Sequence, residues 1–205
     1  GGRVQGRLAG TQAKATITPL DDAGVLPFDA SAQASADWTG SPTITAELSV
    51  RTSQLEAVAN FASRFRPLRL PPGLSYSGTV SCTAQVGWRA NGGLSPIQTV
   101  MQLSDGRIER EEPRLLVTGV NTELVFDDAL AARSALHQEL SFESAIIGSV
   151  PVDGGVLHYA VEGPDHVFLE HGTFQWCGGR VITHAVRFRP SMPNLSLTLF
   201  ADGVE

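Results

Sequence analysis

Hydrophobic and polar residues alternate with a period of two along most of this chain of 205 residues. Such alternation is typical of β-strands with one buried and one solvated face, because successive side chains of a strand point to opposite sides. The clearest runs span residues 43–50, 79–88, 136–142 and 180–188, and shorter runs recur at 3–8, 13–18, 32–38, 97–103, 115–126, 156–161, 167–176 and 195–200. In the run 180–188 the pattern predicts Ile182, Val186 and Phe188 on the apolar face and Thr183 on the polar face. The chain is therefore expected to be all-β, with about twelve strands.

Turn sequences rich in glycine separate these runs, among them Asp105-Gly106, Asp153-Gly154-Gly155 and Cys177-Gly178-Gly179. Each can reverse the chain, so we expect neighbouring strands to be mostly antiparallel. One segment departs from the pattern, because apolar residues recur at helical spacing between residues 53 and 65. Ser53 and Glu56 form a capping box and Pro67 ends the segment, which predicts one amphipathic helix.

A sheet with one apolar face must cover that face. The second half of the sheet could fold over to make a β-sandwich or a closed barrel, the helix could cap part of it, or an apolar ligand could fill a groove formed by a curled sheet. The alternation alone does not choose between these covers. From the residues alone the β-sandwich is the favoured interpretation, because most alternating antiparallel sheets are packed in that way.

Charge and motifs exclude several functions. The net charge is −6, from 15 Lys and Arg against 21 Asp and Glu, and no basic cluster is present, so nucleic acid is not expected as a partner. No window reaches the roughly 18 to 20 apolar residues that a membrane-spanning helix needs. Neither a nucleophile elbow nor a phosphate-binding loop occurs, and the adjacent Asp127 and Asp128 fit a solvated turn. We therefore expect a protein that is not an enzyme and has no cofactor.

The histidines give no ligand set for a metal. His166 and His171 are five residues apart, which places them on opposite faces of a regular strand. His158 and His184 could meet across a strand ladder, but no further ligand is placed beside them. No metal site is expected.

Two cysteines, Cys82 and Cys177, lie too far apart in the sequence for a redox or zinc-binding pair. They could form one disulfide bond in an oxidising compartment. Two free thiols are the favoured interpretation, because nothing in the sequence brings the two residues within bonding distance.

The second half of the chain carries segments that resemble a known family. They are residues 119–128, 138–142, Gly148, 155–159, 166–170, 176–181 and 195–204, with a looser likeness at 76–88. These segments are similar to the YdbH family of AsmA-like envelope proteins of Gram-negative bacteria. The resemblance covers about the last hundred residues, and its motifs are glycine turns and alternation patterns.

The resemblance implies a long, twisted and curled sheet that forms an apolar groove. Such a protein is anchored in the inner membrane by an N-terminal helix, crosses the periplasm and carries phospholipid toward the outer membrane. At the C-terminal end of the full-length protein, a small outer-membrane lipoprotein is expected to add strands by edge pairing. Residues 1–205 are then expected to form a single periplasmic segment of this sheet, internal or in the C-terminal half, with a helical insertion at about 53–65 and adjoining segments of the same protein as neighbours.

Within this interpretation one face of the strands lines a groove for phospholipid acyl chains. The expected lining residues are Ile44, Leu48, Val80, Val86, Leu124, Phe126, Leu140, Phe142, Val186, Phe188, Leu197 and Leu199. Each could equally be an ordinary core position. Two other functions remain open, a structural or protein-binding β-sandwich module of the cell envelope and a dicarboxylate carrier that would use Arg107, Arg110 and Arg114.

Overall fold

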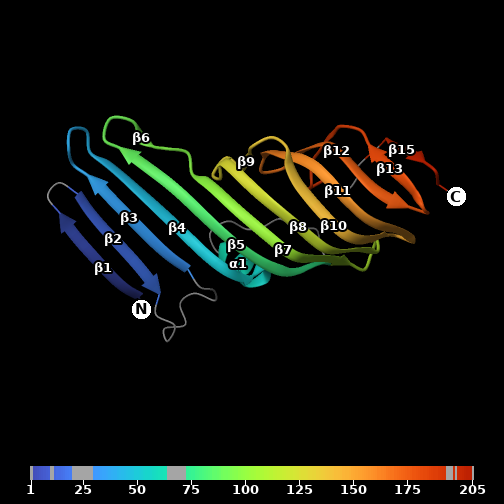
Figure 1. Cartoon of the computed structure of the whole chain (residues 1–205), viewed down its shortest axis with the longest axis horizontal. Helices are drawn as coiled ribbons and strands as arrows, with labels where there is room; N and C mark the ends of the chain where they lie inside the picture. The colour runs from blue at the N-terminus through green and yellow to red at the C-terminus, as the bar shows by residue number, and fades with distance from the viewer. Residues whose placement is uncertain are drawn as a thin grey trace.

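The strands of this protein form one long antiparallel sheet. The structure is a computed structural model that describes residues 2–9, 12–19, 30–63, 73–192, 196 and 198–204. The sheet has 15 strands, and twelve of them follow the hydrogen-bonded order β1-β2-β3-β4-β5-β7-β8-β10-β11-β12-β13-β15. Three short strands add to this path, because β6 pairs with β5, β9 with β8 and β14 with β12. Figure 1 shows the strands side by side in chain order, with the two ends of the chain at opposite ends of the sheet.

The elements have the following bounds. The first half contains β1 (Gly2–Ala9), β2 (Gln12–Pro19), β3 (Ala30–Asp37), β4 (Thr43–Gln54), α1 (Leu55–Ala62), β5 (Leu74–Arg89), β6 (Gly93–Leu94) and β7 (Gln98–Arg110). The second half contains β8 (Leu115–Asp128), β9 (Arg133–Ser134), β10 (Gln138–Ile147), β11 (Val150–Gly163), β12 (His166–Trp176), β13 (Gly179–Thr183), β14 (Val186–Phe188) and β15 (Leu199–Asp202).

The sheet stays open and single-layered. Its path runs from β1 to β15 without closing into a barrel, and the described strands form no second sheet that packs on the first. The prediction of an all-β fold with one helix and a long curled sheet is confirmed. The alternative of a β-sandwich is wrong, because consecutive strands continue to pair with one another along a single sheet instead of folding back as a second layer.

The predicted helix forms, but it begins later than its capping signal suggested. Helix α1 spans Leu55–Ala62 and packs against β5 and β4. Ser53 and Gln54 are the last residues of β4, where Ser53 pairs with Val80. The Ser53 hydroxyl donates to the carbonyl of Arg51 at 2.8 Å, so it does not form the expected capping box. The predicted stop at Pro67 lies outside the described residues.

A line of bulges crosses the middle of the sheet. The register shifts between Ser77 and Thr79 on β5, between Leu103 and Ile108 on β7, and between Asp153 and Gly155 on β11. Residues with positive φ stand along the same line, Gly78 at 134°, Asp105 at 52°, Gly119 at 64° and Gly154 at 39°. A bulge bends its strand and increases the local twist, so a row of bulges on neighbouring strands bends the whole sheet. We call this row the crease.

Two of the predicted turns are therefore wrong. Asp105-Gly106 lies inside β7 and Asp153-Gly154-Gly155 lies inside β11, where both belong to the crease. Glycine and aspartate favour bulges as well as hairpin turns, because both conformations need the left-handed region of φ and ψ. By contrast, a hairpin turn forms between β12 and β13 at the predicted Cys177-Gly178-Gly179, where Cys177 and Gly178, with φ of 46° and 76°, are the two loop residues and Gly179 begins β13.

Two predicted runs also differ in detail. The run 180–188 is split into β13 and β14, so its alternation does not continue through His184 and Ala185. As a result Thr183 is buried whereas Ile182 is 41% exposed, the reverse of the predicted facing. The run 136–142 begins two residues late at Gln138, because His137 has a φ of 58° that ends the extended backbone.

Close contacts across the crease make its glycines sensitive to substitution. A Cβ atom added at the buried Gly106 would lie 2.9 Å from Val120 Cβ and 3.0 Å from the Val120 carbonyl oxygen. We expect Gly106→Ala to lower the free energy of unfolding by about 1–3 kcal/mol, measured by urea denaturation.

Gly163, at the end of β11, provides the matched control. It is also buried and lacks a positive φ, but an added Cβ would meet only His166 Nδ1, at 3.8 Å. Gly163→Ala is expected to leave the stability unchanged or to raise it by up to about 1 kcal/mol. Equal losses in both variants would contradict tight packing at the crease.

Candidate functional site

The register places the apolar positions of successive strands on one face of the sheet. Directly paired residues share a face, and Leu140 on β10 pairs with Leu157 on β11 and with Thr122 on β8. Thr122 in turn pairs with Leu103 on β7, which pairs with Val80 on β5. We call the face that carries Leu140 the apolar face and the opposite one the polar face.

A cavity of about 540 Å³ lies on the apolar face between β7 and β15. Hydrocarbon side chains line almost all of it, and no charged side chain takes part. The lining residues are Ile108, Val117, Val120, Leu140, Phe142, Ala145, Ile147, Val152, Leu157, Tyr159, Val167, Leu169, Phe174, Thr183, Phe188 and Leu199. The cavity can exclude water from an apolar ligand, but it offers little that would fix a polar one.

Four of the residues predicted from the sequence line this cavity, Leu140, Phe142, Phe188 and Leu199. Others lie on the same face by register but outside the cavity, namely Ile44, Leu48, Val80, Val86, Leu124, Phe126 and Val186. Val80 and Leu124 are 2% and 8% exposed, so they pack inside the protein, whereas Leu48 is 48% exposed. Leu197 is outside the described residues.

Sequence reasoning missed the lining residues beyond the crease. Val117 and Val120 both line the cavity although they are three residues apart, and the same holds for Phe142 and Ala145. A simple alternation would place the members of each pair on opposite faces. An irregularity in the pairing of β7 and β8 reverses the facing between Val117 and Val120, and a glycine such as Gly119 within an alternating run was the signal that could have shown it.

Two residues bring polar atoms into the cavity, Tyr159 and Thr183. The Tyr159 hydroxyl lies 3.1 Å from the Thr122 hydroxyl, which donates to the carbonyl of Glu139 at 2.6 Å. Burial raises the pKa of Tyr159, and the hydrogen bond with Thr122 offsets part of this effect. Tyr159 therefore stays neutral and adds no charge to the cavity.

A comparison with known protein families identifies the family to which this chain belongs. The family model named YdbH-like, described as intermembrane phospholipid transport protein YdbH, matches residues 2–199. The chain belongs to the YdbH-like family. The match confirms the family suggested by the sequence, and it extends through the first seventy residues as well as the last hundred. No curated protein and no solved structure matched the chain.

The YdbH-like family is one of intermembrane phospholipid transport. An apolar cavity on an open sheet agrees with a lipid cargo, because acyl chains need a lining without fixed polar groups. Among the described residues, no helix has the length and apolar character needed to cross a membrane.

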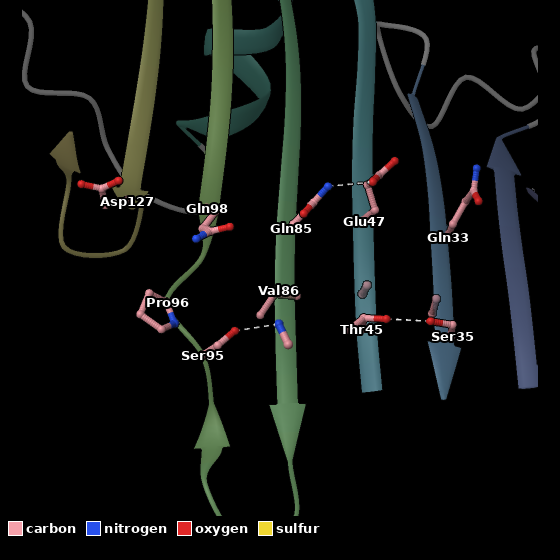
Figure 2. A pocket seen from close by; sticks show the side chains of 13 residues that line it. Gln33, Ser35, Thr45, Glu47, Gln85, Val86, Ser95, Pro96, Gln98 and Asp127 are labelled. Carbon is pink, nitrogen blue, oxygen red and sulfur yellow. Dashed lines mark hydrogen bonds between the residues drawn. The ribbon is translucent and has the colours of Figure 1, made fainter. Parts of the chain in front are cut away.

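The polar face carries a second hollow, of about 640 Å³, over β3, β4, β5 and the segment that leads to β7. Figure 2 shows that several of its polar groups pair with one another. Gln85 Nε2 donates to Glu47 Oε2 at 3.0 Å, and the Ser35 and Thr45 hydroxyls lie 2.6 Å apart. Because these groups already satisfy each other, the hollow is better explained as a solvated surface than as a ligand site.

The histidine pair that forms in the structure differs from the pair of His158 and His184 that the sequence suggested. His158 pairs with His171 and not with His184, and their rings stack with centroids 4.3 Å apart. A bulge at Glu170 shifts the register of β11 and β12 and sets this pairing. His184 contacts Phe200 edge to face. No group of three or more potential ligands is arranged to hold a metal ion in the part of the chain that the structure describes.

The two cysteines are free thiols. Cys82 is half-buried on β5, where burial raises the pKa of its thiol, and Cys177 is exposed in the turn after β12. Four strands lie between β5 and β12 in the sheet order, and a disulfide needs Cα atoms within about 7 Å. The structure therefore does not form the disulfide that the sequence left open.

Two of the three arginines considered for dicarboxylate binding, Arg107 and Arg110, lie beside glutamates. Arg107 donates from Nε and Nη2 to Glu109 Oε2 at 3.2 and 3.0 Å. Arg110 borders a hollow that glutamates also line, Glu109, Glu111 and Glu112. Carboxylates around this hollow would repel a dianion, so the arrangement gives no support to a dicarboxylate carrier.

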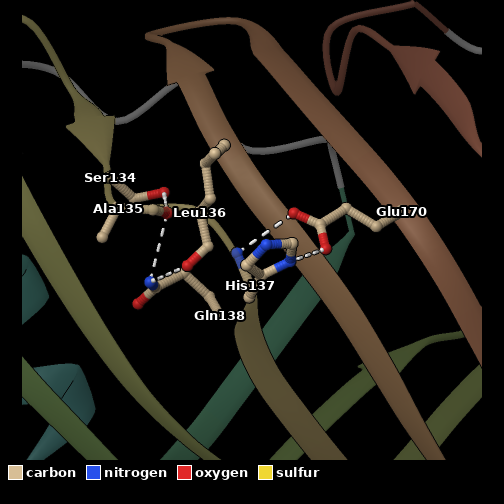
Figure 3. A network of polar contacts seen from close by, with 6 residues as sticks. All are labelled: Ser134, Ala135, Leu136, His137, Gln138 and Glu170. Carbon is tan, nitrogen blue, oxygen red and sulfur yellow. Dashed lines mark hydrogen bonds and ion pairs between the residues drawn. The ribbon is translucent and has the colours of Figure 1, made fainter.

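A polar network holds the segment before β10 in place, and Figure 3 shows part of it. The buried Gln138 accepts from the Val125 amide at 2.7 Å and donates to the carbonyls of Ala135 and Leu136. The buried Ser134 hydroxyl accepts from the Val161 amide at 2.8 Å, which ties β9 to β11. Both residues lie on the apolar face by register, so their polar groups are satisfied inside the protein.

Glu170 joins the same segment to β12. Its carboxylate accepts from the His137 backbone amide at 3.0 Å and lies 2.5 Å from His137 Nδ1 (Figure 3). Burial of the carboxyl group raises the pKa of Glu170, but the hydrogen bonds from His137 and the charges of His137 and His158 outweigh this effect. The pKa of Glu170 is therefore lower than its ordinary value.

A lowered pKa makes the contribution of Glu170 depend on pH. Its stabilising effect is present above the unfolded-state pKa of about 4.3 and is lost as the pH falls through the lower folded-state pKa. We expect the difference in unfolding free energy between the wild type and Glu170→Gln to be fully present above about pH 5 and to shrink below about pH 4. Urea denaturation between pH 3 and 7 measures this difference, and a constant difference over that range would contradict the role of the charge.

Proposed function

We propose that the apolar cavity holds phospholipid acyl chains and forms part of a groove along which phospholipid crosses the periplasm. The observation that carries the proposal is the lining of the cavity, which presents hydrocarbon side chains without a charge on the open face of a single sheet. Membership of the YdbH-like family supports phospholipid as the cargo.

The energetics of the cavity suit a cargo that must move. Burial of each methylene group of an acyl chain contributes about 0.8 kcal/mol, so several buried methylenes offset a large part of the cost of leaving a bilayer. A volume of about 540 Å³ lies within the common range for small-molecule ligand sites, about 300–1,000 Å³. Because the lining carries no ion pair or charged group, no single contact holds the cargo at one place.

The groove is proposed to continue toward β4 along the same face. Ile44 pairs with Trp88, Leu48 with Ala84 and Ala46 with Val86, so apolar side chains stand side by side beyond the cavity. Leu48 and Trp88 are 48% and 38% exposed, which leaves this surface open to a further part of the lipid. The remaining predicted residues on this face, Val80, Leu124, Phe126 and Val186, are proposed to support the lining.

The proposed setting is a longer protein anchored in the inner membrane, with this chain in the periplasm. Adjoining segments of that protein would continue the sheet beyond β1 and β15, which end the hydrogen-bonded order of the described strands. An outer-membrane lipoprotein is a further proposed partner at the C-terminus of the full-length protein. The proposed role is transport without catalysis.

Lipid analysis tests the proposal directly. The protein is expressed in the bacterial periplasm, purified without detergent and extracted for mass spectrometry. Phospholipid in about stoichiometric amount is the expected result, because the cavity is apolar and open to the solvent on one side. A folded protein without lipid would contradict the proposal.

A pair of adjacent residues tests where the lipid lies. Phe142 lines the cavity, and its ring occupies the space over Gly155, whereas Ser141 points to the polar face. We expect Phe142→Asp to abolish crosslinking of phospholipid to a photoreactive residue placed at Leu157, because a buried carboxylate is incompatible with an acyl chain.

Ser141→Asp is the matched control and is expected to leave crosslinking unchanged. Circular dichroism checks that both variants keep the β-sheet signal. Val86→Asp tests the continuation of the groove on β5 in the same way. Crosslinking that survives Phe142→Asp in a folded protein would exclude the cavity as the lipid site.

A further inference from the structure

Arg110, the last residue of β7, places a positive charge on the apolar face of the sheet. It pairs with Leu74 on β5 and with Leu115 on β8. Leu115 pairs in turn with Ile147, which lines the apolar cavity. Directly paired residues share a face, and Ile108, two residues before Arg110, lines the cavity as well. Arg110 therefore stands beside the cavity but outside its lining.

The guanidinium group of Arg110 has no partner among the described residues. Its Nε atom is buried without a hydrogen bond, and within the described part of the chain no hydrogen bond or ion pair involves its two Nη atoms. The side chain is half-buried and the Nη atoms are not, so they can be reached from the solvent. A guanidinium group binds phosphate well, because its donors match two phosphate oxygens. Arg110 is therefore suited to a phosphate group at the end of the cavity.

Two free carboxylates accompany Arg110. Glu109 already forms an ion pair with Arg107, at 3.0 Å between Nη2 and Oε2. Glu111 and Glu112 follow in the exposed turn between β7 and β8, and among the described residues neither has an ion-pair partner. Both line a hollow of about 430 Å³ together with Arg110. The hollow therefore offers unpaired charges of both signs.

Charges of both signs suit a zwitterionic ligand. Arg114 ends the same turn, so two arginines balance Glu111 and Glu112. The carboxylates repel a dianion, whereas a headgroup with a phosphate and an ammonium group meets an opposite charge at each end. We propose that this turn selects phospholipids with a zwitterionic headgroup, with Arg110 binding the phosphate and Glu111 and Glu112 the ammonium group, while the acyl chains enter the cavity. This inference rests on the proposed function.

Such a contact selects the cargo without holding it. The turn is exposed, and ion pairs at exposed sites are weak because water screens both charges. The lining of the cavity itself still carries no charge. The headgroup contact therefore favours one class of lipid by a small factor, and the lipid can leave it to advance along the groove.

A competition between lipids with identical acyl chains tests the inference. The purified protein is incubated with vesicles of dioleoyl phosphatidylethanolamine, dioleoyl phosphatidylglycerol and dioleoylglycerol, isolated again and analysed for bound lipid by mass spectrometry. We expect phosphatidylethanolamine to exceed phosphatidylglycerol about threefold relative to the vesicles, the effect of an exposed charge contact. Equal uptake of all three lipids would overturn the selection but leave the acyl-chain cavity standing, whereas uptake of none would overturn the proposed function itself.

A double substitution tests the partners of the ammonium group. Glu111→Gln with Glu112→Gln is expected to take up phosphatidylethanolamine and phosphatidylglycerol equally. Glu47→Gln with Glu123→Gln is the matched control, because it removes the same two charges from the polar face, where each carboxylate accepts a hydrogen bond from a glutamine. The control is expected to keep the preference. A preference that survives in the first variant, or that is lost in the control, would overturn the inference.

Arg110 is tested through the phosphate group. Arg110→Gln is expected to lower the uptake of both phospholipids about threefold relative to dioleoylglycerol, which has no phosphate, and Arg110→Lys is expected to keep most of the uptake. Circular dichroism checks that the variants keep the β-sheet signal. Unchanged uptake in a folded Arg110→Gln protein would overturn the role of Arg110.

A soluble probe distinguishes a lipid headgroup from a free ligand of the same chemistry. Glycerophosphoethanolamine carries the same phosphate and ammonium groups without acyl chains. We expect it to displace no lipid at the concentration of the phosphatidylethanolamine, because burial of the acyl chains supplies most of the binding. Displacement at that concentration would assign the turn to a soluble ligand and overturn its role in lipid selection.

Discussion

A single-layered sheet cannot cover its own apolar face, and the rest of this structure depends on that constraint. The ladder of backbone hydrogen bonds satisfies the polar backbone from β1 to β15, but it leaves the apolar side chains without an opposing layer. The crease bends the second half of the sheet, and the residues on its two sides come together around the apolar cavity. The bend therefore covers part of the apolar face, which a second sheet would cover in a β-sandwich.

The polar groups of the two faces are satisfied in different ways. On the polar face, side chains of neighbouring strands pair with each other, as Gln85 does with Glu47 and Gln102 with Glu123. On the apolar face, polar atoms are either tied into the structure, as in Gln138 and Tyr159, or left unpaired, as in Thr183. An apolar lining with few polar contacts suits a cargo that moves along the protein, because each fixed contact would have to break before the cargo advances.

The sequence predicted the strands well because alternation depends only on the local chain. It failed where a residue type fits two structures, as at Asp105-Gly106, which forms a bulge within β7 and not a turn. The failure has consequences for the site, because every bulge reverses the facing of the residues after it. Leu140 and Phe142 were predicted on the cavity side of the crease, whereas Ala145 and Val152 beyond it were missed. The strand pattern is also interrupted after Thr183, and there the prediction of which β13 side chains are buried was wrong.

The sequence by itself determined the all-β class, the single helix, the two faces of most strands and the family. These features follow from the period of two, from local turn preferences and from residue patterns, all of which act over short stretches of chain. Only the tertiary structure decided that the sheet stays open, where it bends and which side chains meet in the cavity. Those features depend on pairing between strands and on register, and a shift of one residue on one strand moves its side chains to the other face of the sheet.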